Sequence, residues 1–283
     1  MKDSYFHSNF FINCKGKLID FSTPKIMGIL NATPDSFYDG GKNNTINKAL
    51  PLVEKHLNDG ASFIDIGGYS SRPGADHIDT DTELSRVIPL IEAIVKRFPD
   101  CILSTDTFRS KVAEKSIEAG AAIINDISAF NLDAKMVDVL VRYKVPYIMM
   151  HMKGNPQNMQ QNIHYDNILK ELILFFSKKI SYLNSRGISD IIIDPGFGFS
   201  KTSEQNYELL QNLHSFSLLK HPILAGISRK SMIYKNLNTS SLRSINGTTA
   251  LNMSLLENGA NILRVHDVKE AAECIQLHQL VNA

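Results

Sequence analysis

The sequence has few cysteines, almost no net charge and no long apolar run, and each shortage excludes a class of protein. The three cysteines among 283 residues, Cys14, Cys101 and Cys274, are far apart and odd in number, so they predict neither a disulfide framework nor a zinc site. A formal net charge of +1 gives no reason to expect nucleic acid or an acidic membrane surface. No apolar run approaches the roughly 18 residues of a membrane span, and the N-terminus lacks an apolar signal core. We therefore expect a cytoplasmic protein.

The sequence does contain a repeated pair of patterns. Short apolar segments that end in polar residues or glycine occur at 25–31, 63–68, 101–107, 123–128, 147–152, 191–196, 223–228 and 262–267. Segments with helical periodicity follow them, at 46–59, 82–98, 110–119, 134–143, 166–186, 203–213, 247–258 and 268–281. Eight strand-then-helix units predict an α/β protein with a single (β/α)8 TIM barrel.

Glycine and proline punctuate the repeat in alternation. A glycine suited to a left-handed helix end precedes the second, fourth, sixth and eighth strands, and a proline precedes each of the others. Residues 1–23 read as a β-hairpin that turns at Lys15 and Gly16 and caps the N-terminal mouth of the barrel. Since no linker or low-complexity stretch divides the chain, we expect residues 1–283 to form one domain that includes the hairpin.

Polar residues collect where the predicted strands end. In a TIM barrel the active site lies at these carboxyl ends. They carry Asn31, Ser70, Ser71, Arg72, Asp106, Asn125, His151, Asp194, Ser228, Arg229, Lys230, Arg264 and His266. Any one of them is more often a cap or a loop anchor, but a set drawn from every strand predicts a binding site.

The chemistry of this set suggests a ligand with two different ends. Asp106, Asn125 and Asp194 suit a flat ring that carries N–H donors, because a carboxylate accepts two parallel hydrogen bonds. Asn31, Arg72, Arg264 and His266 suit an anion such as phosphate, and their strands become neighbours when the barrel closes. The residues therefore predict a donor-rich heterocycle joined to phosphate.

These strand ends also resemble the motifs of one family. The matching stretches are "NATPDSFYDGG" (31–41), "DIGGYSSRPGA" (65–75), "STDTFR" (104–109), "NDIS" (125–128), "MHMKGNPQNMQ" (150–160), "DPGFGFSKT" (194–202), "GISRKSMI" (226–233) and "RVHDVKE" (264–270). In this order they resemble the dihydropteroate synthases, which are pterin-binding TIM barrels and usually homodimers. The resemblance implies a transferase of folate biosynthesis and a target of sulfonamides. Its reaction condenses 6-hydroxymethyl-7,8-dihydropterin diphosphate with 4-aminobenzoate, giving 7,8-dihydropteroate and pyrophosphate.

The resemblance also implies residue roles. For the pterin it implies Asp106, Asn125, Asp194, Lys230, Arg264 and Phe199, and for pyrophosphate Asn31, Arg72, Arg264 and His266. For aminobenzoate it implies Phe37, Ser71, Arg72, Pro73, Phe199 and Ser231. Asp106, Lys230, Arg264 and Asn31 are the implied catalytic residues, with Mg²⁺ near Asn31. The usual "GGESTRPG" is "GGYSSRPG" here, so that Tyr69 replaces an acid and Ser71 a threonine.

Two other functions remain open at this stage. A pterin-dependent methyltransferase would share Asp106, Asn125 and Asp194, but it has no need of the "TPDSF" and "SSRPG" loops or of the lysine in "SRK". A catalytically silent pterin-binding partner is the second alternative, and Tyr69 is the one feature that favours it. We expect His151 and Ser228 to support the rim, Asp65 to lie behind it, and Asp76, Asp79, Asp81 and Glu83 to cap the following helix.

Overall fold

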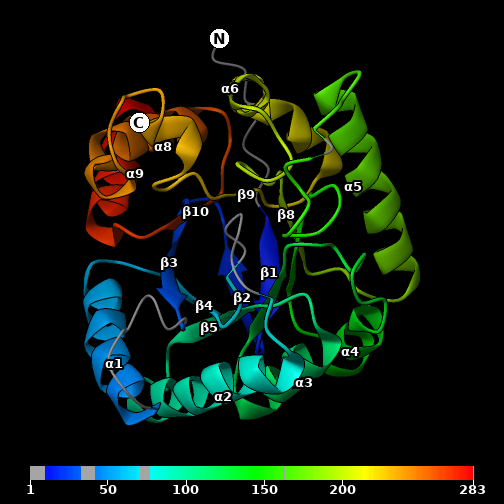
Figure 1. Cartoon of the computed structure of the whole chain (residues 1–283), viewed down its shortest axis with the longest axis vertical. Helices are drawn as coiled ribbons and strands as arrows, with labels where there is room; N and C mark the ends of the chain where they lie inside the picture. The colour runs from blue at the N-terminus through cyan, green and yellow to red at the C-terminus, as the bar shows by residue number, and fades with distance from the viewer. Residues whose placement is uncertain (1–9, 33–41, 71–76, 162, 283) are drawn as a thin grey trace.

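In the computed structural model, a ring of helices surrounds a sheet of parallel strands (Figure 1). The structure describes residues 10–32, 42–70, 77–161 and 163–282, with the backbone alone at 42–45. The strands of the sheet are β3 (Lys25–Asn31), β4 (Phe63–Gly67), β5 (Ile102–Asp106), β6 (Ile123–Asp126), β7 (Tyr147–Met150), β8 (Ile191–Asp194), β9 (Leu224–Ala225) and β10 (Ile262–Val265). Their order is β8-β7-β6-β5-β4-β3-β10-β9, and a parallel bridge from Ile193 to Ile223 closes the ring. The predicted barrel is confirmed.

The helices cover the outside of the barrel. They are α1 (Lys42–Asn58), α2 (Thr80–Arg97), α3 (Ser110–Ala119), α4 (Met136–Tyr143), α5 (Ile168–Ser185), α6 (Ser203–Gln211), α7 (Ser231–Tyr234), α8 (Ile245–Glu257) and α9 (Val268–Asn282). Two 3₁₀ segments, η3 (Leu213–Leu219) and η4 (Ser241–Arg243), complete the set in the described chain. The helical periodicity of the sequence did not predict α7, η3 or η4, because segments of one or two turns are too short to show a helical period. No helix in the described ranges is long and apolar enough to cross a membrane.

The glycines before alternate strands have the predicted backbone conformation. Gly60, Gly120, Gly187 and Gly259 have φ of 103°, 115°, 78° and 91°. Gly120 forms the left-handed C-cap of α3, with its N–H directed to the carbonyl groups of Ser116 and Ile117. A side chain is strained at such φ values, so glycine lets each helix stop and the chain enter the next strand.

The start of α2 partly corrects the capping prediction. Asp79 is the N-cap, and its carboxylate accepts a hydrogen bond of 2.7 Å from the N–H of Thr82. Glu83 also lies in the first turn, but it is fully buried and forms an ion pair with Arg109 instead. A charge moved out of water needs a partner, which is why this acid is paired across to the next loop. Asp76 lies outside the described residues.

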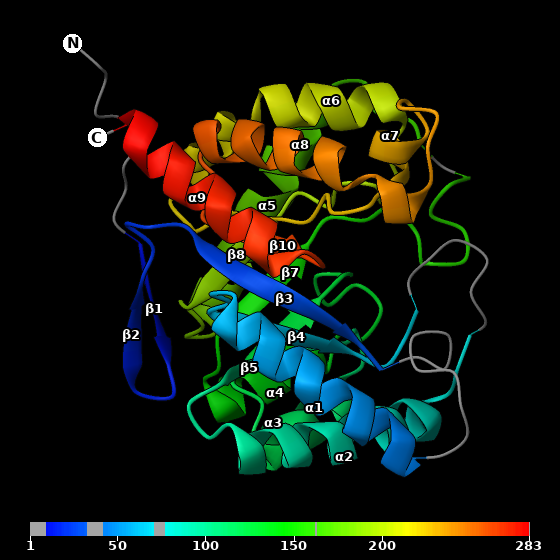
Figure 2. The ribbon, with the colours of Figure 1, turned by 90° about the vertical axis from the view of Figure 1, so that its left-hand side faces the viewer.

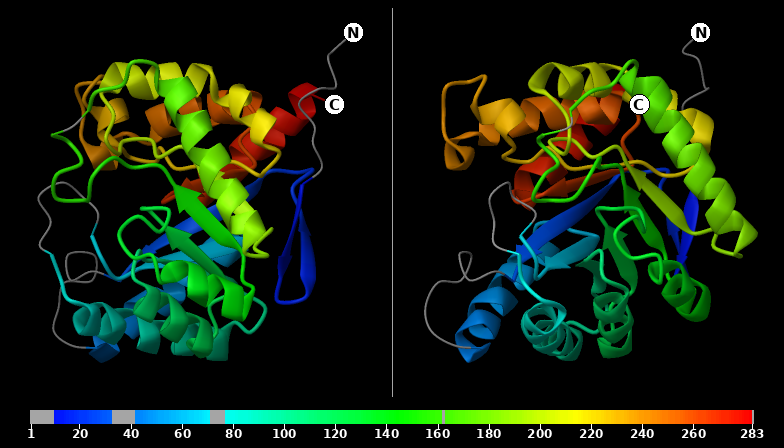
Figure 3. Two further views of the ribbon diagram at one scale, coloured as in Figure 1. Left: turned by 90° about the vertical axis from the view of Figure 1, so that its right-hand side faces the viewer. Right: turned by 45° about the vertical axis from the view of Figure 1, so that its right-hand side comes forward.

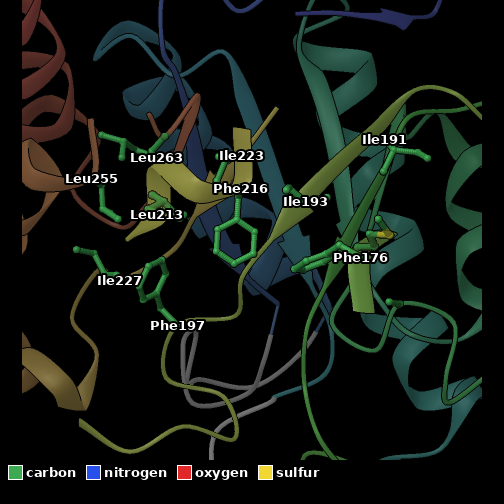
Figure 4. Close-up of a cluster of buried hydrophobic side chains, with 14 of the residues drawn as sticks. Phe176, Ile191, Ile193, Phe197, Leu213, Phe216, Ile223, Ile227, Leu255 and Leu263 are labelled. Atoms are coloured by element: carbon green, nitrogen blue, oxygen red, sulfur yellow. The ribbon is translucent and has the colours of Figure 1, made fainter. Parts of the chain in front are cut away.

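Apolar side chains fill the layer between strands and helices. Figure 4 shows one part of it, where Phe176 of α5, Phe216 of η3 and Leu255 of α8 pack around the strands. Ile191 and Ile193 of β8 belong to the same cluster and are completely buried. The isoleucine run before Asp194 is therefore buried, as the sequence predicted.

The hairpin closes one end of the barrel. Its strands are β1 (Phe11–Cys14) and β2 (Lys17–Asp20), joined at the predicted turn of Lys15 and Gly16. Figures 2 and 3 show it apart from the ring of helices, on the side where β3 begins. Ile12, Cys14 and Phe21 form a buried cluster with residues near the starts of the barrel strands. The amino-terminal mouth is thus sealed, and the opposite mouth is left for a ligand.

Candidate active site

The inner face of the barrel changes from apolar to polar along each strand. Side chains two residues apart on a strand point to the same side. Near the closed end, Phe63, Ile123, Ile192 and Ile262 form the apolar layer against the hairpin. Two residues further along the same strands stand Asp65, Asn125, Asp194 and Arg264. One period-two pattern therefore seals the bottom of the barrel and places polar groups above it.

Arg264 joins two acids at the centre of this polar layer. Its Nε donates to Oδ2 of Asp65 at 2.7 Å, and its Nη2 donates to Oδ2 of Asp106 at 2.8 Å. Asn125 Nδ2 donates to the same Asp65 oxygen at 2.9 Å. Asp65 is fully buried, whereas about a fifth of the Arg264 and Asp106 side chains is exposed. Asp65 therefore lies behind the other two, as predicted, and fixes the orientation of Arg264 and Asn125.

The electrostatics of the cluster weaken the acidity of Asp106. Burial raises the pKa of Asp106 to about 7, because the charged form loses hydration. The Arg264 guanidinium lowers this pKa, and the nearby Asp65 carboxylate raises it. Asp106 therefore changes charge near neutral pH, which is a common property of catalytic acids and bases.

An acid at a strand end can anchor the following turn or face a ligand, and the contacts of Asp194 bear on both roles. Its Oδ1 accepts a hydrogen bond of 2.8 Å from the N–H of Gly196, so one oxygen anchors the turn that follows β8. Burial raises the pKa of Asp194, and the Lys230 ammonium opposes that effect. Asp194 is thus a loop anchor through one oxygen, and among the described residues no hydrogen-bond donor contacts its other oxygen.

The glycines of "DPGFGFS" give Lys230 its place. Gly196 and Gly198 have φ of 75° and 79°, and a Cβ at Gly198 would lie 2.9 Å from Cδ of Lys230. The Lys230 ammonium donates to the Phe197 carbonyl and lies 4.5 Å from the centre of the Phe199 ring. Burial lowers the pKa of Lys230 to about 8. Any larger residue at position 198 would displace this lysine.

The sequence did not reveal the role of Lys201, which lies in the loop after β8, whereas Lys230 comes from the loop after β9. Lys201 is buried, and its ammonium donates to the carbonyl oxygens of Gly196 at 2.9 Å and Phe199 at 3.0 Å. It also lies 3.3 Å from Nδ1 of His151, so His151 supports the rim as predicted. Burial lowers the pKa of Lys201 to about 7 and that of His151 to about 2. No pattern in "FSKT" distinguishes an inward lysine from a solvated one.

The end of β10 brings a histidine beside a serine. Ser228 Oγ lies 3.0 Å from Nδ1 of His266 and accepts from the His266 N–H at 3.2 Å. Asp267 pairs with Arg229 through two guanidinium nitrogens, Nε at 3.0 Å and Nη2. Asp267 is therefore occupied by Arg229, and Arg264 is left to the inner acids.

Of the remaining predicted residues, some belong to the described ranges of the chain and some lie outside them. Asn31 ends β3 and is paired in register with Gly67 of β4, next to Asp106 of β5. Ser231 is the first residue of α7 and is exposed. Phe37, Ser71, Arg72 and Pro73 lie outside the described residues. The described rim therefore brings together Asn31, Asp106, Asn125, Asp194, Phe199, Lys230, Arg264 and His266 on the strand ends or the loops that directly follow them.

Comparison with known proteins gives a consistent result. A family model described as pterin binding enzyme matches residues 27–266. The dihydropteroate synthase of Haemophilus influenzae is 42% identical over 265 residues, which are 93% of this chain and 96% of that protein. The dihydropteroate synthase of Escherichia coli strain K12 is 40% identical and covers 93% of each chain.

Solved structures agree in fold as well as in sequence. Dihydropteroate synthase of Yersinia pestis, solved with a sulfonamide drug complex, superposes with a TM-score of 0.90 at 39% identity and covers 96% of this chain and 99% of that one. The Xanthomonas albilineans enzyme with 4-aminobenzoic acid has a TM-score of 0.90 at 35% identity, covering 98% and 99%. The similarity therefore covers nearly the whole chain.

Proposed function

The chain belongs to the pterin-binding enzyme family and, within it, to the dihydropteroate synthases, and from that premise we propose how its own residues perform the reaction. The substrates are 6-hydroxymethyl-7,8-dihydropterin diphosphate and 4-aminobenzoate. The bond from the pterin methylene carbon to the diphosphate oxygen breaks, and a bond from that carbon to the amine nitrogen forms. The amine releases a proton, and the products are 7,8-dihydropteroate and pyrophosphate.

The single observation that carries the proposal is the bridge from Arg264 to Asp65 and Asp106. A guanidinium has five N–H donors, and the two acids use two of them. The planar group therefore retains donors for an anion while its acid contacts fix its orientation. An arginine held in this way suits the diphosphate end of the substrate and lies flat beside an aromatic ring.

We assign the pterin ring to Asp106, Asn125, Asp194, Lys230 and Phe199. The free oxygen of Asp194 accepts from ring N–H groups, and Asn125, held by Asp65, keeps its carbonyl oxygen as a further acceptor. Lys230 donates to acceptor atoms of the ring. These groups are complementary to the alternating donors and acceptors of a pterin edge.

We assign the diphosphate to Asn31, Arg72, Arg264 and His266. Ser228 orients His266 through its contact with Nδ1. Asn31 lies at the end of β3, which pairs with β10 on one side and β4 on the other. Arg72 is carried from the family resemblance, because it lies outside the described residues.

A divalent cation fits this end of the site. Among the described residues no cluster of three histidines, cysteines or acids is arranged to hold a metal. Mg²⁺ needs no such cage, since it is commonly bound by one or two protein oxygens together with substrate phosphates and water. Asn31 supplies one amide oxygen of the preferred type. A Mg²⁺ ion held there would supply charge neutralisation for the pyrophosphate leaving group.

The reaction proceeds by departure of pyrophosphate before attack of the amine. Departure leaves positive charge delocalised into the electron-rich dihydropterin, and the ionised Asp106 stabilises that charge in a shielded site. Arg264 and His266 stabilise the negative charge on the leaving group. The amine of aminobenzoate is neutral at pH 7, so it needs positioning more than a strong base.

We assign aminobenzoate to Phe37, Ser71, Arg72, Pro73, Phe199 and Ser231. Of these, Phe199 and Ser231 belong to the described chain, and Phe199 lies beside Lys230 at the boundary with the pterin site. The others follow from the resemblance of the "TPDSF" and "SSRPG" loops.

We further propose that residues 1–283 act as one domain and that the protein is cytoplasmic. We also propose that it is a homodimer, and sedimentation equilibrium would test this oligomeric state.

The function is tested by product formation from both substrates. We expect pyrophosphate release and dihydropteroate, detected by mass, when both substrates and Mg²⁺ are present. Asp106→Asn should lower turnover at least a hundredfold. Asp138→Asn, which alters an exposed acid paired with Arg186 on the outer surface, is the matched control and should keep full activity. A purified protein that binds pterin but releases no pyrophosphate would support the silent binding partner instead.

A further inference from the structure

Lys201 is a buried cation whose hydrogen-bond partners in the described chain are all uncharged. It is 4% exposed, and its ammonium contacts the His151 ring and the carbonyl oxygens of His151, Gly196 and Phe199. Burial lowers the pKa of Lys201 to about 7, so the unfolded chain binds this proton more tightly than the folded protein does. The charge on Lys201 therefore costs stability at neutral pH, and this cost disappears as the pH rises from about 7 to the ordinary value of 10.5. Stabilisation of the fold by an ion pair does not explain this lysine.

The loop that Lys201 contacts has an irregular backbone. Gly196, Gly198 and Ser200 have φ of 75°, 79° and 51°, so every second residue of this stretch is left-handed. Ser200 is strained in this conformation, since its side chain disfavours it. The stretch belongs to no helix or strand, and its peptide groups therefore need partners from elsewhere in the fold.

Two buried side chains supply those partners to residues 196–199, which we call the 196–199 turn. Lys201 donates to the carbonyl oxygens of Gly196 at 2.9 Å and Phe199 at 3.0 Å, and the Phe199 N–H donates to the Gly196 carbonyl at 3.1 Å. Oδ1 of Asn206, in α6, accepts from the Gly198 N–H at 2.7 Å. The ammonium thus joins the two ends of the turn, and the amide holds its middle.

The 196–199 turn sets two groups that we assign to the pterin. The Gly196 N–H donates to Oδ1 of Asp194 at 2.8 Å, and the Phe197 carbonyl accepts from the Lys230 ammonium. A Cβ at Gly198 would lie 2.9 Å from Cδ of Lys230, so this backbone and the lysine stem are closely packed. A shift of the turn would therefore move the Asp194 carboxylate and the Lys230 ammonium relative to each other.

The groups that we assign to the diphosphate are held by other contacts. Arg264 donates to Asp65 and Asp106, and the His266 N–H donates to Ser228 Oγ. These contacts involve neither Lys201 nor the 196–199 turn. The two ends of the substrate therefore depend on separately supported parts of the rim.

We propose that Lys201 is a positioning residue for the pterin ring and acts through the 196–199 turn. By holding the carbonyl groups at both ends of the turn, it keeps Asp194 and Lys230 at the spacing that the edge of one flat ring requires. The inference rests on the proposed function, in which Asp194 and Lys230 bind the pterin. It adds a role for a side chain that acts on the substrate only through other residues.

The test removes the ammonium and keeps the apolar stem. In Lys201→Met we expect the Kd for 6-hydroxymethylpterin, which carries no phosphate, to rise about tenfold in calorimetry, equivalent to about 1.4 kcal/mol. The Kd for inorganic pyrophosphate with Mg²⁺ should stay within twofold, because Arg264 and His266 keep their partners. A general loosening of the barrel would instead weaken both ligands.

Lys179→Met is the matched control. Lys179 is a partly buried lysine of α5, outside the barrel, and its ammonium donates to the Ala129 carbonyl at 2.8 Å and to Oδ1 of Asn131 at 2.6 Å. Both Kd values should stay within twofold in this variant. Asn206→Ala removes the acceptor of the Gly198 N–H and should give the same selective loss as Lys201→Met. It decides the question if Lys201→Met does not fold.

Three results would overturn the inference: a pterin Kd within threefold of the parent in Lys201→Met or Asn206→Ala, equal increases in both Kd values, or the same selective loss in Lys179→Met. If the unaltered protein makes dihydropteroate from both substrates and Lys201→Met keeps its pterin affinity, the inference alone fails. If the unaltered protein makes no dihydropteroate, the proposed function fails, whatever the variants bind.

Discussion

Replacing Arg264 with lysine keeps the positive charge and removes the planar bridge. Arg264 reaches Asp65 and Asp106 through two nitrogens at 2.7 and 2.8 Å, whereas one ammonium holds only one of these acids at that distance. Loss of one hydrogen bond to a buried charged group costs about 1.5 to 3 kcal/mol of unfolding free energy. At about 2 to 3 °C for each kcal/mol in a chain of this size, Tm should fall by about 3 to 9 °C.

Activity should fall much further than this loss of stability explains. Lysine contacts the diphosphate as a point charge and cannot lie flat along the pterin ring. We expect kcat/KM for the pterin diphosphate to decrease on the order of a hundredfold, about 2.7 kcal/mol of transition-state stabilisation. Pyrophosphate release should be measured at a temperature well below the Tm of the variant, with Tm recorded on the same sample.

Arg229→Lys is the control variant: it weakens a similar ion pair, and so lowers stability, at an arginine to which we assign no substrate contact. Arg229 also holds a carboxylate through two nitrogens, but its partner is Asp267. This variant should lose a comparable amount of stability and keep kcat/KM within a few-fold of the parent. The reasoning is refuted if Arg264→Lys retains kcat/KM within threefold, or if both variants lose activity equally.

Three further predictions concern binding and pH. Asp194→Asn keeps one acceptor for the Gly196 N–H and so keeps the fold, but its amide group replaces the second acceptor; calorimetry should show a loss of pterin affinity of roughly 3 kcal/mol or more, and unchanged affinity would exclude the assignment. Aminobenzoate should bind measurably only with pyrophosphate or the pterin diphosphate present, because the site that we propose for it draws on the Gly- and Pro-containing sequences "TPDSFYDGG" and "YSSRPGADH"; equal affinity without them would contradict ordered assembly. Because the proposed mechanism needs Asp106 ionised and Lys230 protonated, kcat/KM should fall below pH about 7 and above pH about 8. Asp106→Asn should lack the acidic limb and Lys230→Arg the alkaline one, whereas limbs that persist in both variants would assign them to the substrate.

The strands and their polar ends were predictable because both signals are local. A buried strand shows as an apolar run, and the polar residue at or near its end is read directly from the sequence, as at Asp194, which ends β8, and Arg264, one residue before the end of β10. Period two then places Asp65 on the same inner face as Gly67. The residue roles came from the family motifs. Formation of the barrel does not depend on these roles, so the fold alone does not test them.

The contacts across the barrel were not predictable in the same way. Arg264 and Asp65 are 199 positions apart, and only closure of the ring decides which acid lies within 2.7 Å of the guanidinium. Glu83 was expected to cap a helix because its sequence position fits that role, but packing turned it inward to Arg109. Lys201 was missed because burial of a lysine depends on carbonyl groups that the fold of the loop supplies.

The hairpin that seals the barrel has a consequence for how the protein is made. Its apolar face docks on strands that follow much later in the chain, and the Asn13 N–H bonds to Asp190 across 177 positions. One edge of β3 likewise pairs with β10, so this edge stays unpaired until β10 has been synthesised. While the ribosome is still adding the C-terminal half, the emerged chain therefore presents an open strand edge and an uncovered apolar hairpin. We expect nascent chains stalled before β10 to be bound by chaperones or to aggregate. Release of β10 from the ribosome should end the exposure, because β10 can then pair with β3.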